Sequence, residues 1–197
     1  MIRAEVTDFA LDRERIAAVR THAGRIACTA CVLAAGVFSC PLMAGLGLRA
    51  PLESERGCHI VFEADEGGPR APVMIADGRF VATPMADGLR CARLVEFGGT
   101  AAGPSRAPLD FLRRQARAAF PALRAAGERT WMGHRPALSD SLPAIGEAGA
   151  TGVFAAFGHH HVGLTGGPKT GRIVADMIAG ARLNLDLAPC DPNRFAG

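Results

Sequence analysis

The stretch GVFAAFGHHHVGLTGG, residues 152–167, decides how this sequence folds. Small apolar residues from Gly152 to Phe157 predict a buried strand, and the glycine- and histidine-rich run Gly158–Gly167 predicts a loop. A helix from about Pro168 to Ile178 should follow, because Pro168 suits a first helical turn and Gly180 suits a C-cap. Such a loop presents free N–H groups and the positive end of a helix dipole. The alternative is that its glycines only permit close packing.

The N-terminal part of the chain predicts further strands. Ala4–Ala10 and Ile16–Thr21 are short strand candidates, and Gly24 can supply the positive φ of a hairpin turn. The continuous apolar run Cys31–Gly36 predicts a strand that is buried on both faces. Ser39 is a candidate N-cap for a short helix through Leu46.

The middle of the chain has the pattern of an antiparallel sheet with hairpins. The expected strands are Cys58–Phe62, Val73–Ala76, Arg79–Thr83 and Leu89–Val95, with turns at Asp77-Gly78 and Asp87-Gly88. Residues Leu109–Leu123 predict an amphipathic helix with Pro121 in its last turn. The order of elements predicts an α/β (α+β) fold with a discontinuous domain of residues 1–50 and 132–184. Residues 51–131 form an inserted antiparallel-sheet domain, and residues 185–197 form a C-terminal tail.

Composition narrows the class of protein. Hydrophobic residues make up 49% of the 197 residues, which indicates a globular chain. A net charge of +3 without a basic stripe argues against nucleic-acid binding. Glycines and a proline interrupt the richest apolar stretch, Cys28–Leu48, and the N-terminus lacks a basic segment followed by an apolar one. We therefore expect no membrane span, no signal peptide, and a cytoplasmic protein with free cysteines.

Five stretches occur in the order and spacing of motifs from one flavoenzyme family. They are VLAAGVFS (32–39), RGCH (56–59), TPM with GLR and EF (83–97), GHRP with Asp140 and LPAIG (133–146), and GH with GLT and GR (158–172). Together they resemble the C-terminal half of the DAO family of FAD-dependent amino-acid oxidoreductases, which includes glycine oxidase and D-amino acid dehydrogenase. The resemblance covers nearly the whole chain, which makes it more specific than any single motif.

The resemblance implies part of a Rossmann-like FAD-binding domain with an inserted substrate domain. It implies that FAD is the cofactor and that the helix after the glycine loop points at the flavin edge. The cofactor-binding residues would be Ala34, Ala35, Gly36, His159, Gly163, Leu164 and Thr165. Small residues at a strand end let a nucleotide approach the backbone closely, which fits this assignment.

The resemblance also implies that the substrate is a small amino acid of the D configuration, since the chain is most like a D-amino acid dehydrogenase. Arg135 of the GHRP motif would bind its carboxylate with a bidentate fork, and His59 would lie in the same substrate site. Taken alone, Arg135 better suits a structural pair with a carboxylate such as Asp140, and only the resemblance favours the substrate role. Hydride transfer from Cα to flavin needs no catalytic base, so no catalytic acid or base is assigned. The electron acceptor is left open between oxygen, a quinone and a carrier protein.

Three patterns are judged to carry no chemistry. Cys28 and Cys31 form a C-x-x-C, but thiols at that spacing on a strand point to opposite faces, so neither zinc nor redox use is expected. Three consecutive histidines, 159–161, cannot converge on one metal, and no role is assigned to His160 or His161. The run GLGLRA, 45–50, imitates a dinucleotide fingerprint but lacks the required strand before it.

The sequence also departs from the family pattern. Phe38 replaces tryptophan, Cys58 replaces tyrosine, Arg93 and Ser141 replace glycine, and the chain contains no tyrosine. The family's G-x-G-x-x-G near the start of the full protein is missing. We therefore expect an incomplete chain that oxidises an amino acid, or a non-catalytic fragment or subunit. The subunit would need a partner with the N-terminal FAD-binding half. For the protein as a whole, the alternative to a purely cytoplasmic location is association with the periphery of the inner membrane.

Overall fold

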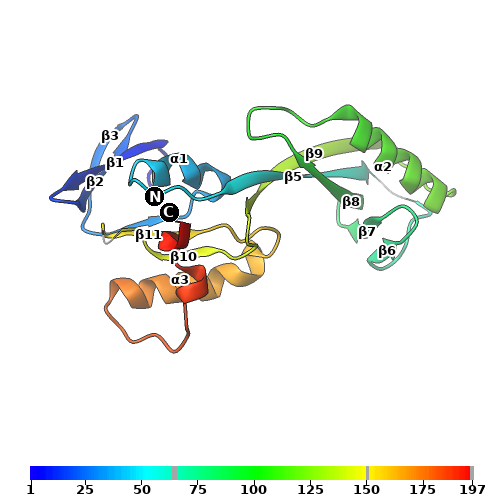
Figure 1. Cartoon of the computed structure of the whole chain (residues 1–197). Helices are drawn as coiled ribbons and strands as arrows, with labels where there is room; N and C mark the ends of the chain where they lie inside the picture. The colour runs from blue at the N-terminus through cyan, green and yellow to red at the C-terminus, as the bar shows by residue number, and fades with distance from the viewer. Residues whose placement is uncertain (64–65, 150, 196–197) are drawn as a thin grey trace. The chain divides into compact units, whose positions relative to one another are not determined.

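The computed structural model describes residues 1–63, 66–149 and 151–195, so the last two residues of the expected C-terminal tail lie outside the described part (Figure 1). The fold is mixed α/β with mostly antiparallel sheets, as the sequence predicts. It divides into two compact units, one of Met1–Glu53 with Arg135–Gly197 and the other of Ser54–His134. The chain enters the second unit within β5 (Leu52–Glu63) and leaves it within β9 (Gly127–Leu138).

The first unit begins with an antiparallel meander. It consists of β1 (Val6–Asp12), β2 (Arg15–Thr21) and β3 (Gly24–Ala27), paired in that order. Gly24 pairs with Thr21 across the second turn and has a φ of +124°, a conformation that glycine adopts without steric cost. The predicted strands and hairpin are therefore confirmed.

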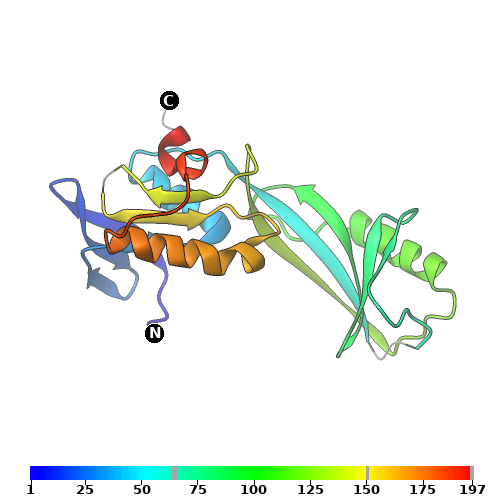
Figure 2. The ribbon, with the colours of Figure 1, turned by 90° about the horizontal axis from the view of Figure 1, so that it is seen from below.

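A second sheet forms the centre of the first unit. Its order is β10 (Ala144–Glu147), β11 (Val153–Phe157) and β4 (Cys31–Leu33), with β11 antiparallel to β10 and parallel to β4. Figures 1 and 2 show α3 (Gly163–Ile178) lying along one face of this sheet.

Alternate residues of β11 enter different cores. Val153, Ala155 and Phe157 pack on the face away from α3, with Phe9, Ile16 and Met43. Phe154 packs on the α3 face, with Ile145, Ile173 and Val174. This alternation is the period of two that a strand imposes on its side chains.

Two predictions in the first unit are wrong. The run Cys31–Gly36 is not buried on both faces, because Leu33 is buried whereas Val32 is 45% exposed. In the sheet that the described residues form, β4 is an edge strand. Helix α1 (Ser39–Ala44) begins at Ser39 but is preceded by Phe38 as N-cap, and it ends before Leu46. The Ser39 side chain therefore does not cap the helix; its hydroxyl is buried without a hydrogen-bond partner among the described residues.

Helix α3 begins earlier than Pro168, which is a correction of the predicted boundary. Gly163 is its first residue, and Pro168 lies inside the helix. Because proline has no N–H, it cannot donate a helical bond to the Leu164 carbonyl. The glycines therefore lie in the first turns of the helix and not in the loop before it. The predicted end is correct, since Ile178 is the last helical residue and Gly180 follows with a φ of +68°.

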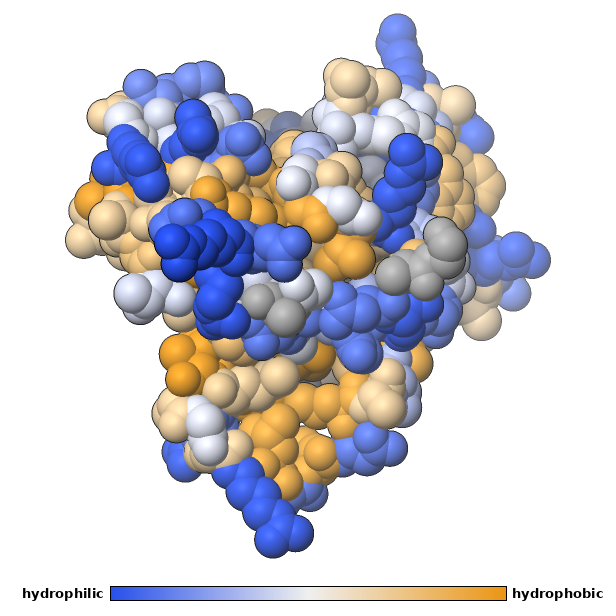
Figure 3. All heavy atoms as spheres, turned by 60° about the vertical axis from the view of Figure 1, so that its left-hand side comes forward, coloured by the Kyte–Doolittle hydropathy of each residue, from blue (hydrophilic) through white to orange (hydrophobic). Residues whose placement is uncertain are grey.

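Apolar side chains also reach the surface of the first unit. Val32, Ile178 and Leu185 are each close to half exposed. Figure 3 shows apolar atoms gathered over the lower part of the face that it brings forward, at the height of α3 and the segment after it. A surface of this kind commonly receives a ligand or a partner.

The second unit is a five-stranded sheet covered on one face by a helix. The strand order is β6 (Val73–Ile75), β7 (Phe80–Met85), β8 (Gly88–Phe97), β5 and β9. Helix α2 (Arg106–Ala119) buries Leu109, Leu112 and Ala116 against it. The strands, both hairpin turns and the amphipathic helix are confirmed. However, α2 starts three residues earlier than predicted, and Pro121 lies beyond its end.

Strand β9 is the element that the sequence pattern missed. Gly133 and Pro136 suggest an irregular segment, yet both lie within the strand. A Cβ at Gly133 would lie 2.0 Å from the Trp131 ring, so this glycine leaves room for the indole beside the strand. No helix of the described residues is long and apolar enough to span a membrane.

Gly88 should be essential to the hairpin between β7 and β8. Its φ is +130°, and a Cβ there would lie 2.1 Å from the Phe62 carbonyl oxygen. We expect Gly88→Ala to lower the free energy of unfolding by about 2–4 kcal/mol, because backbone strain and steric overlap add. Urea denaturation followed by circular dichroism would measure this loss. Gly103→Ala is the control, because no atom lies within 4 Å of a Cβ there, and a similar loss in both variants would contradict the prediction.

Candidate functional site

The candidate site of the first unit lies at the ends of two parallel strands. Because β4 and β11 run in the same direction, Ala34 and His159 follow their carboxyl ends at one edge of the sheet. Both residues line a cavity of 420 Å³, together with the first residue of α3, Gly163. The carboxyl edge of parallel strands is where open α/β sheets bind ligands.

The strand end after β4 is open. Ala34 and Ala35 are exposed, and Gly36 has a φ of +58° with no atom within 4 Å of the point that a Cβ would occupy. A ligand could therefore approach this backbone closely. The structure thus brings Ala34, Ala35 and Gly36 to the same edge as the glycine loop, as the sequence suggests.

The first turn of α3 supplies hydrogen-bond donors. The first helical bond runs from the Gly166 N–H to the Val162 carbonyl at 2.8 Å, so the N–H groups of Gly163, Leu164 and Thr165 precede the helical ladder. Leu164 is 96% exposed and Thr165 is exposed as well, so packed side chains do not seal this turn. Partial positive charge collects at such a helix end and favours an anionic or electron-rich group.

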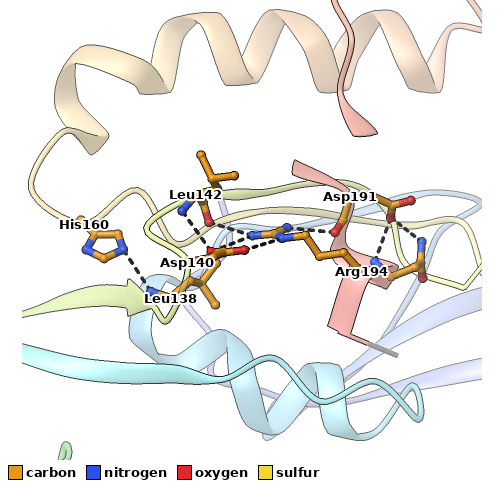
Figure 4. A network of polar contacts seen from close by, with 7 residues as sticks. Leu138, Asp140, Leu142, His160, Asp191 and Arg194 are labelled. Atoms are coloured by element: carbon orange, nitrogen blue, oxygen red, sulfur yellow. Dashed lines mark hydrogen bonds and ion pairs between the residues drawn. The ribbon is translucent and has the colours of Figure 1, made fainter. Parts of the chain in front are cut away.

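Each of the three consecutive histidines has a different environment. His159 bonds Thr170 of α3 at 2.8 Å, and burial lowers the pKa of His159, which favours the neutral ring. The His160 ring nitrogen Nε2 accepts a hydrogen bond from the Leu138 N–H at 3.1 Å (Figure 4). The His160 backbone N–H donates to the Pro136 carbonyl. His161 is exposed. His160 therefore ties the loop to β9, a role that the sequence did not reveal.

Arg135 directly precedes this junction in β9. Its neighbour Pro136 accepts the hydrogen bond from His160, so the backbone at Arg135 adjoins the loop before α3. Among the residues described as lining the 420 Å³ cavity, Arg135 does not occur. Its assignment to substrate stays a prediction.

The carboxylate proposed as a structural partner of Arg135 has a different partner. Asp140 bonds Arg194 through two nitrogens, at 2.7 and 3.2 Å (Figure 4). Arg194 also donates to the carbonyl groups of Leu142 and Asp191. This network fastens the C-terminal segment to the turn after β9.

The second unit holds the other predicted substrate residue. The His59 ring stacks on Trp131, with ring centroids 5.0 Å apart and an interplanar angle of 23°. Both residues line a cavity of 480 Å³ that lies wholly within this unit. Burial, then the charges of Arg90 and Arg129, lower the pKa of His59, so its ring is neutral near pH 7.

The residues that depart from the family pattern have structural environments. Cys58 is buried in the core under α2, and the Arg93 guanidinium lies 4.8 Å from the Phe111 ring centroid of the same helix. Ser141 has a φ of +63°, where glycine would fit without strain. These substitutions therefore lie in packing and turn positions.

Two of the patterns judged to carry no chemistry, Cys28 with Cys31 and the run 45–50, lie in ordinary local structure. Cys28 and Cys31 are free thiols, and burial raises the pKa of Cys31. The run 45–50 is a turn that follows α1, not a strand. In the described part of the chain, no group of three or more His, Cys, Asp or Glu side chains is arranged to hold a metal.

Parallel strand ends, a glycine-rich first helical turn and an inserted antiparallel sheet define a mixed α/β protein, and the carboxyl edge of parallel strands is where such proteins commonly bind ligands. Comparison with known proteins agrees with this class. The family model described as FAD dependent oxidoreductase (DAO) matches residues 1–177, and the chain belongs to that family.

Individual relatives match almost the whole chain. A D-amino-acid oxidase of Bradyrhizobium diazoefficiens is 42% identical over 99% of this chain and 48% of its own length. A D-amino acid dehydrogenase of Paramagnetospirillum magneticum is 31% identical over 93% of this chain and 44% of its own length. The crystal structure of glycine oxidase from Geobacillus kaustophilus has 26% identity and a TM-score of 0.82 over 98% of this chain and 53% of that one. The chain thus spans about half the length of these relatives, and the predicted family is confirmed.

The Asp140–Arg194 pair should make stability depend on pH. Its hydrogen bond with Arg194 lowers the pKa of Asp140 below its usual 3.8, although burial opposes this shift. The stabilisation is therefore complete above that value and is lost as pH falls through the depressed pKa. Because the pair is partly exposed, we expect Asp140→Asn to cost only about 0.5–1 kcal/mol at pH 7.

Urea denaturation of both proteins between pH 7 and pH 2.5 would test this. The difference between wild type and Asp140→Asn should shrink as the pH falls below 4. A difference that stays constant over this range would show that the charge of Asp140 contributes nothing. Asp110→Asn is the comparison, since Asp110 pairs with Arg113 on the surface of α2.

Proposed function

We propose that this chain forms the substrate domain and the flavin-edge part of an enzyme that oxidises a small D-amino acid with FAD. One observation carries the proposal: the first turn of α3 begins at the edge where the parallel strands β4 and β11 end. Sequence similarity to a D-amino-acid oxidase supports the choice of substrate class.

The residues at this edge fit a dinucleotide flavin. Gly36 leaves its backbone open to close approach. The 420 Å³ cavity is mostly apolar and is lined in part by the small residues Ala34, Gly167 and Gly171. The N–H groups of Gly163, Leu164 and Thr165 would stabilise negative charge at the flavin edge. When bound, FAD supplies the acceptor for a hydride from the substrate.

The remaining task of the protein is to orient a neutral amino acid. Arg135 would bind the substrate carboxylate with its guanidinium fork, which fixes the Cα–H bond in space. As hydride leaves Cα, the nitrogen lone pair forms the C=N bond and the nitrogen proton passes to water. The imino acid then hydrolyses to a keto acid and ammonia. A neutral His159 near this edge avoids a positive charge that would compete with Arg135.

A second candidate function is that of a subunit that completes a flavoprotein with a partner. The observation in its favour is the edge strand β4, whose Val32 side chain is 45% exposed and lines the apolar cavity beside α3. Parallel strands are normally covered on both faces, and an unpaired edge accepts another strand. The partner would carry the dinucleotide fingerprint and a strand and helix that fit this edge.

Flavin absorbance separates the two candidates. The chain is purified alone, and again after co-expression with the N-terminal half of the Bradyrhizobium D-amino-acid oxidase. Stoichiometric FAD on the chain alone supports the enzyme, and FAD only on the co-expressed pair supports the subunit. Absence of FAD from both preparations would contradict both candidates.

Arg135→Leu tests the substrate site in whichever preparation holds FAD. Loss of a bidentate charge-assisted bond should lower kcat/KM for a D-amino acid by roughly 30–100-fold, mainly through KM, while flavin content stays unchanged. Oxygen uptake and dye reduction are measured in parallel, so that oxidase and dehydrogenase activities are both detected. Arg182→Leu, on the exposed segment after α3, is the control. Unchanged kinetics in Arg135→Leu would remove Arg135 from the substrate site.

A further inference from the structure

The second unit contains a cavity whose charged residues have no role in the proposed reaction. Helix α2 covers one face of its sheet, and the cavity of 480 Å³ lies against residues of the other face. The lining residues come from β5, the end of β7 and the turn after it, β8 and β9: His59, Val61, Met85, Asp87, Arg90, Arg129, Thr130 and Trp131.

Strand pairing gathers these side chains on one face. In the antiparallel ladder, Val61 of β5 lies opposite Arg90 of β8, and Arg90 lies opposite Thr83 of β7. Directly paired residues point to the same side of a sheet. The neighbouring pair Phe62 and Leu89 points into the core under α2. Arg90 is therefore held on the cavity face by the register of three strands.

The two arginines of the cavity differ in how their charge is compensated. Arg129 bonds Asp87 at 2.6 Å and also pairs with Glu63, so its charge has two carboxylate partners. No described residue accepts a hydrogen bond from the Arg90 side chain, and its Nε atom is buried without a partner. A guanidinium can only donate, and a buried donor without an acceptor costs free energy.

The field of Arg90 reaches the other groups of the cavity. It contributes to the lowered pKa of His59 and, after the dominant hydrogen bond from Arg129, to the lowered pKa of Asp87. Arg90 and Arg129 together balance Asp87 and Glu63 in charge, but both carboxylates bond Arg129, so Arg90 is the cation of the lining without a hydrogen-bonded carboxylate among the described residues. The stack of His59 on Trp131 adds an aromatic wall, and Trp131 is 57% exposed.

We propose that this cavity is a carboxylate-binding site in which Arg90 is the anchor and the Trp131–His59 stack contacts the carbon chain of the ligand. The fitting ligands are small organic carboxylates. Its lining lies wholly within the second unit, and binding there requires neither FAD nor catalysis.

The chain provides its own reporter, because Trp131 is its single tryptophan and there is no tyrosine. Tryptophan fluorescence of the purified chain is followed during titration with propionate at constant ionic strength. Propionamide, which has the same shape without the charge, is the control ligand. We expect a saturable change with propionate and at least about tenfold weaker binding of propionamide.

Variants of Arg90 test whether its charge binds propionate. Arg90→Gln should weaken propionate binding at least about tenfold, and Arg90→Lys should weaken it less, because the charge stays while the fork is lost. Arg106→Gln removes the same charge from an exposed position at the start of α2 and should bind propionate as the wild type does. Circular dichroism and the urea midpoint establish that each variant is folded.

Three results would overturn the proposal. These are equal affinity for propionate and propionamide, unchanged binding in both Arg90 variants, and loss of binding in Arg135→Leu but not in Arg90→Gln. None of them depends on flavin, so they are distinct from failure of the proposed function.

Discussion

The parallel pairing of β4 with β11 joins two segments of the first unit that are separated in sequence by the whole second unit. Cys31, Val32 and Leu33 lie opposite Val153, Phe154 and Ala155. Because side chains alternate along a strand, this register sends Leu33 and Ala155 into one core and leaves Val32 on the α3 side. A shift of the pairing register by one residue would turn the core-facing side chains of β4 toward α3 and the α3-facing side chain toward the core. The same register brings the end of β4 and the loop before α3 to one edge, so the candidate flavin site exists only when this pair is formed.

The electrostatics of both units follow a common principle. In the first unit, the positive character at the ligand edge comes from backbone N–H groups at the start of α3, and in the second unit it comes from the guanidinium of Arg90. Each lies near a histidine whose pKa is lowered mainly by burial. A neutral imidazole can accept or donate a hydrogen bond without adding a full charge. Hydrogen-bond donors without partners in the described part of the chain are thus concentrated at the start of α3 and at Arg90, and the adjacent neutral rings can orient a ligand.

Features that depend on neighbours in sequence were predicted well. The hairpin glycines, the alternating strands of the second unit and the amphipathic face of α2 are local patterns, and the structure confirms them. The start of α3 was wrong because proline at a first turn is a local preference, whereas Gly163–Gly167 are helical in the folded unit. Strand β9 was missed because its pairing with β5 is non-local and outweighs the glycine and proline within it.

In the candidate site, too, local motifs could be found from the sequence, whereas features that depend on distant residues could not. The strand end at Ala34–Gly36 and the glycine-rich turn were found from residue type and from the resemblance to a family, because each is a continuous motif. The cavity around Arg90 and Trp131 was not found, since its lining comes from separate strands and depends on their register. Nor could the sequence assign Arg194 to Asp140, because the partners lie 54 residues apart.

The residues that depart from the family pattern also indicate how this chain can recognise a ligand. Cys58 and Arg93 lie on the α2 side of the sheet, so these two substitutions alter the core and leave the cavity lining to other residues. With no tyrosine in the chain, the phenolic hydroxyl is absent from the groups that can hold a substrate. The lining of the second unit instead offers arginine, aspartate, threonine and histidine. Recognition by charged groups weakens as salt screens them, whereas a hydroxyl contact is far less sensitive to salt. The carboxylate site that we propose would therefore select its ligand by charge.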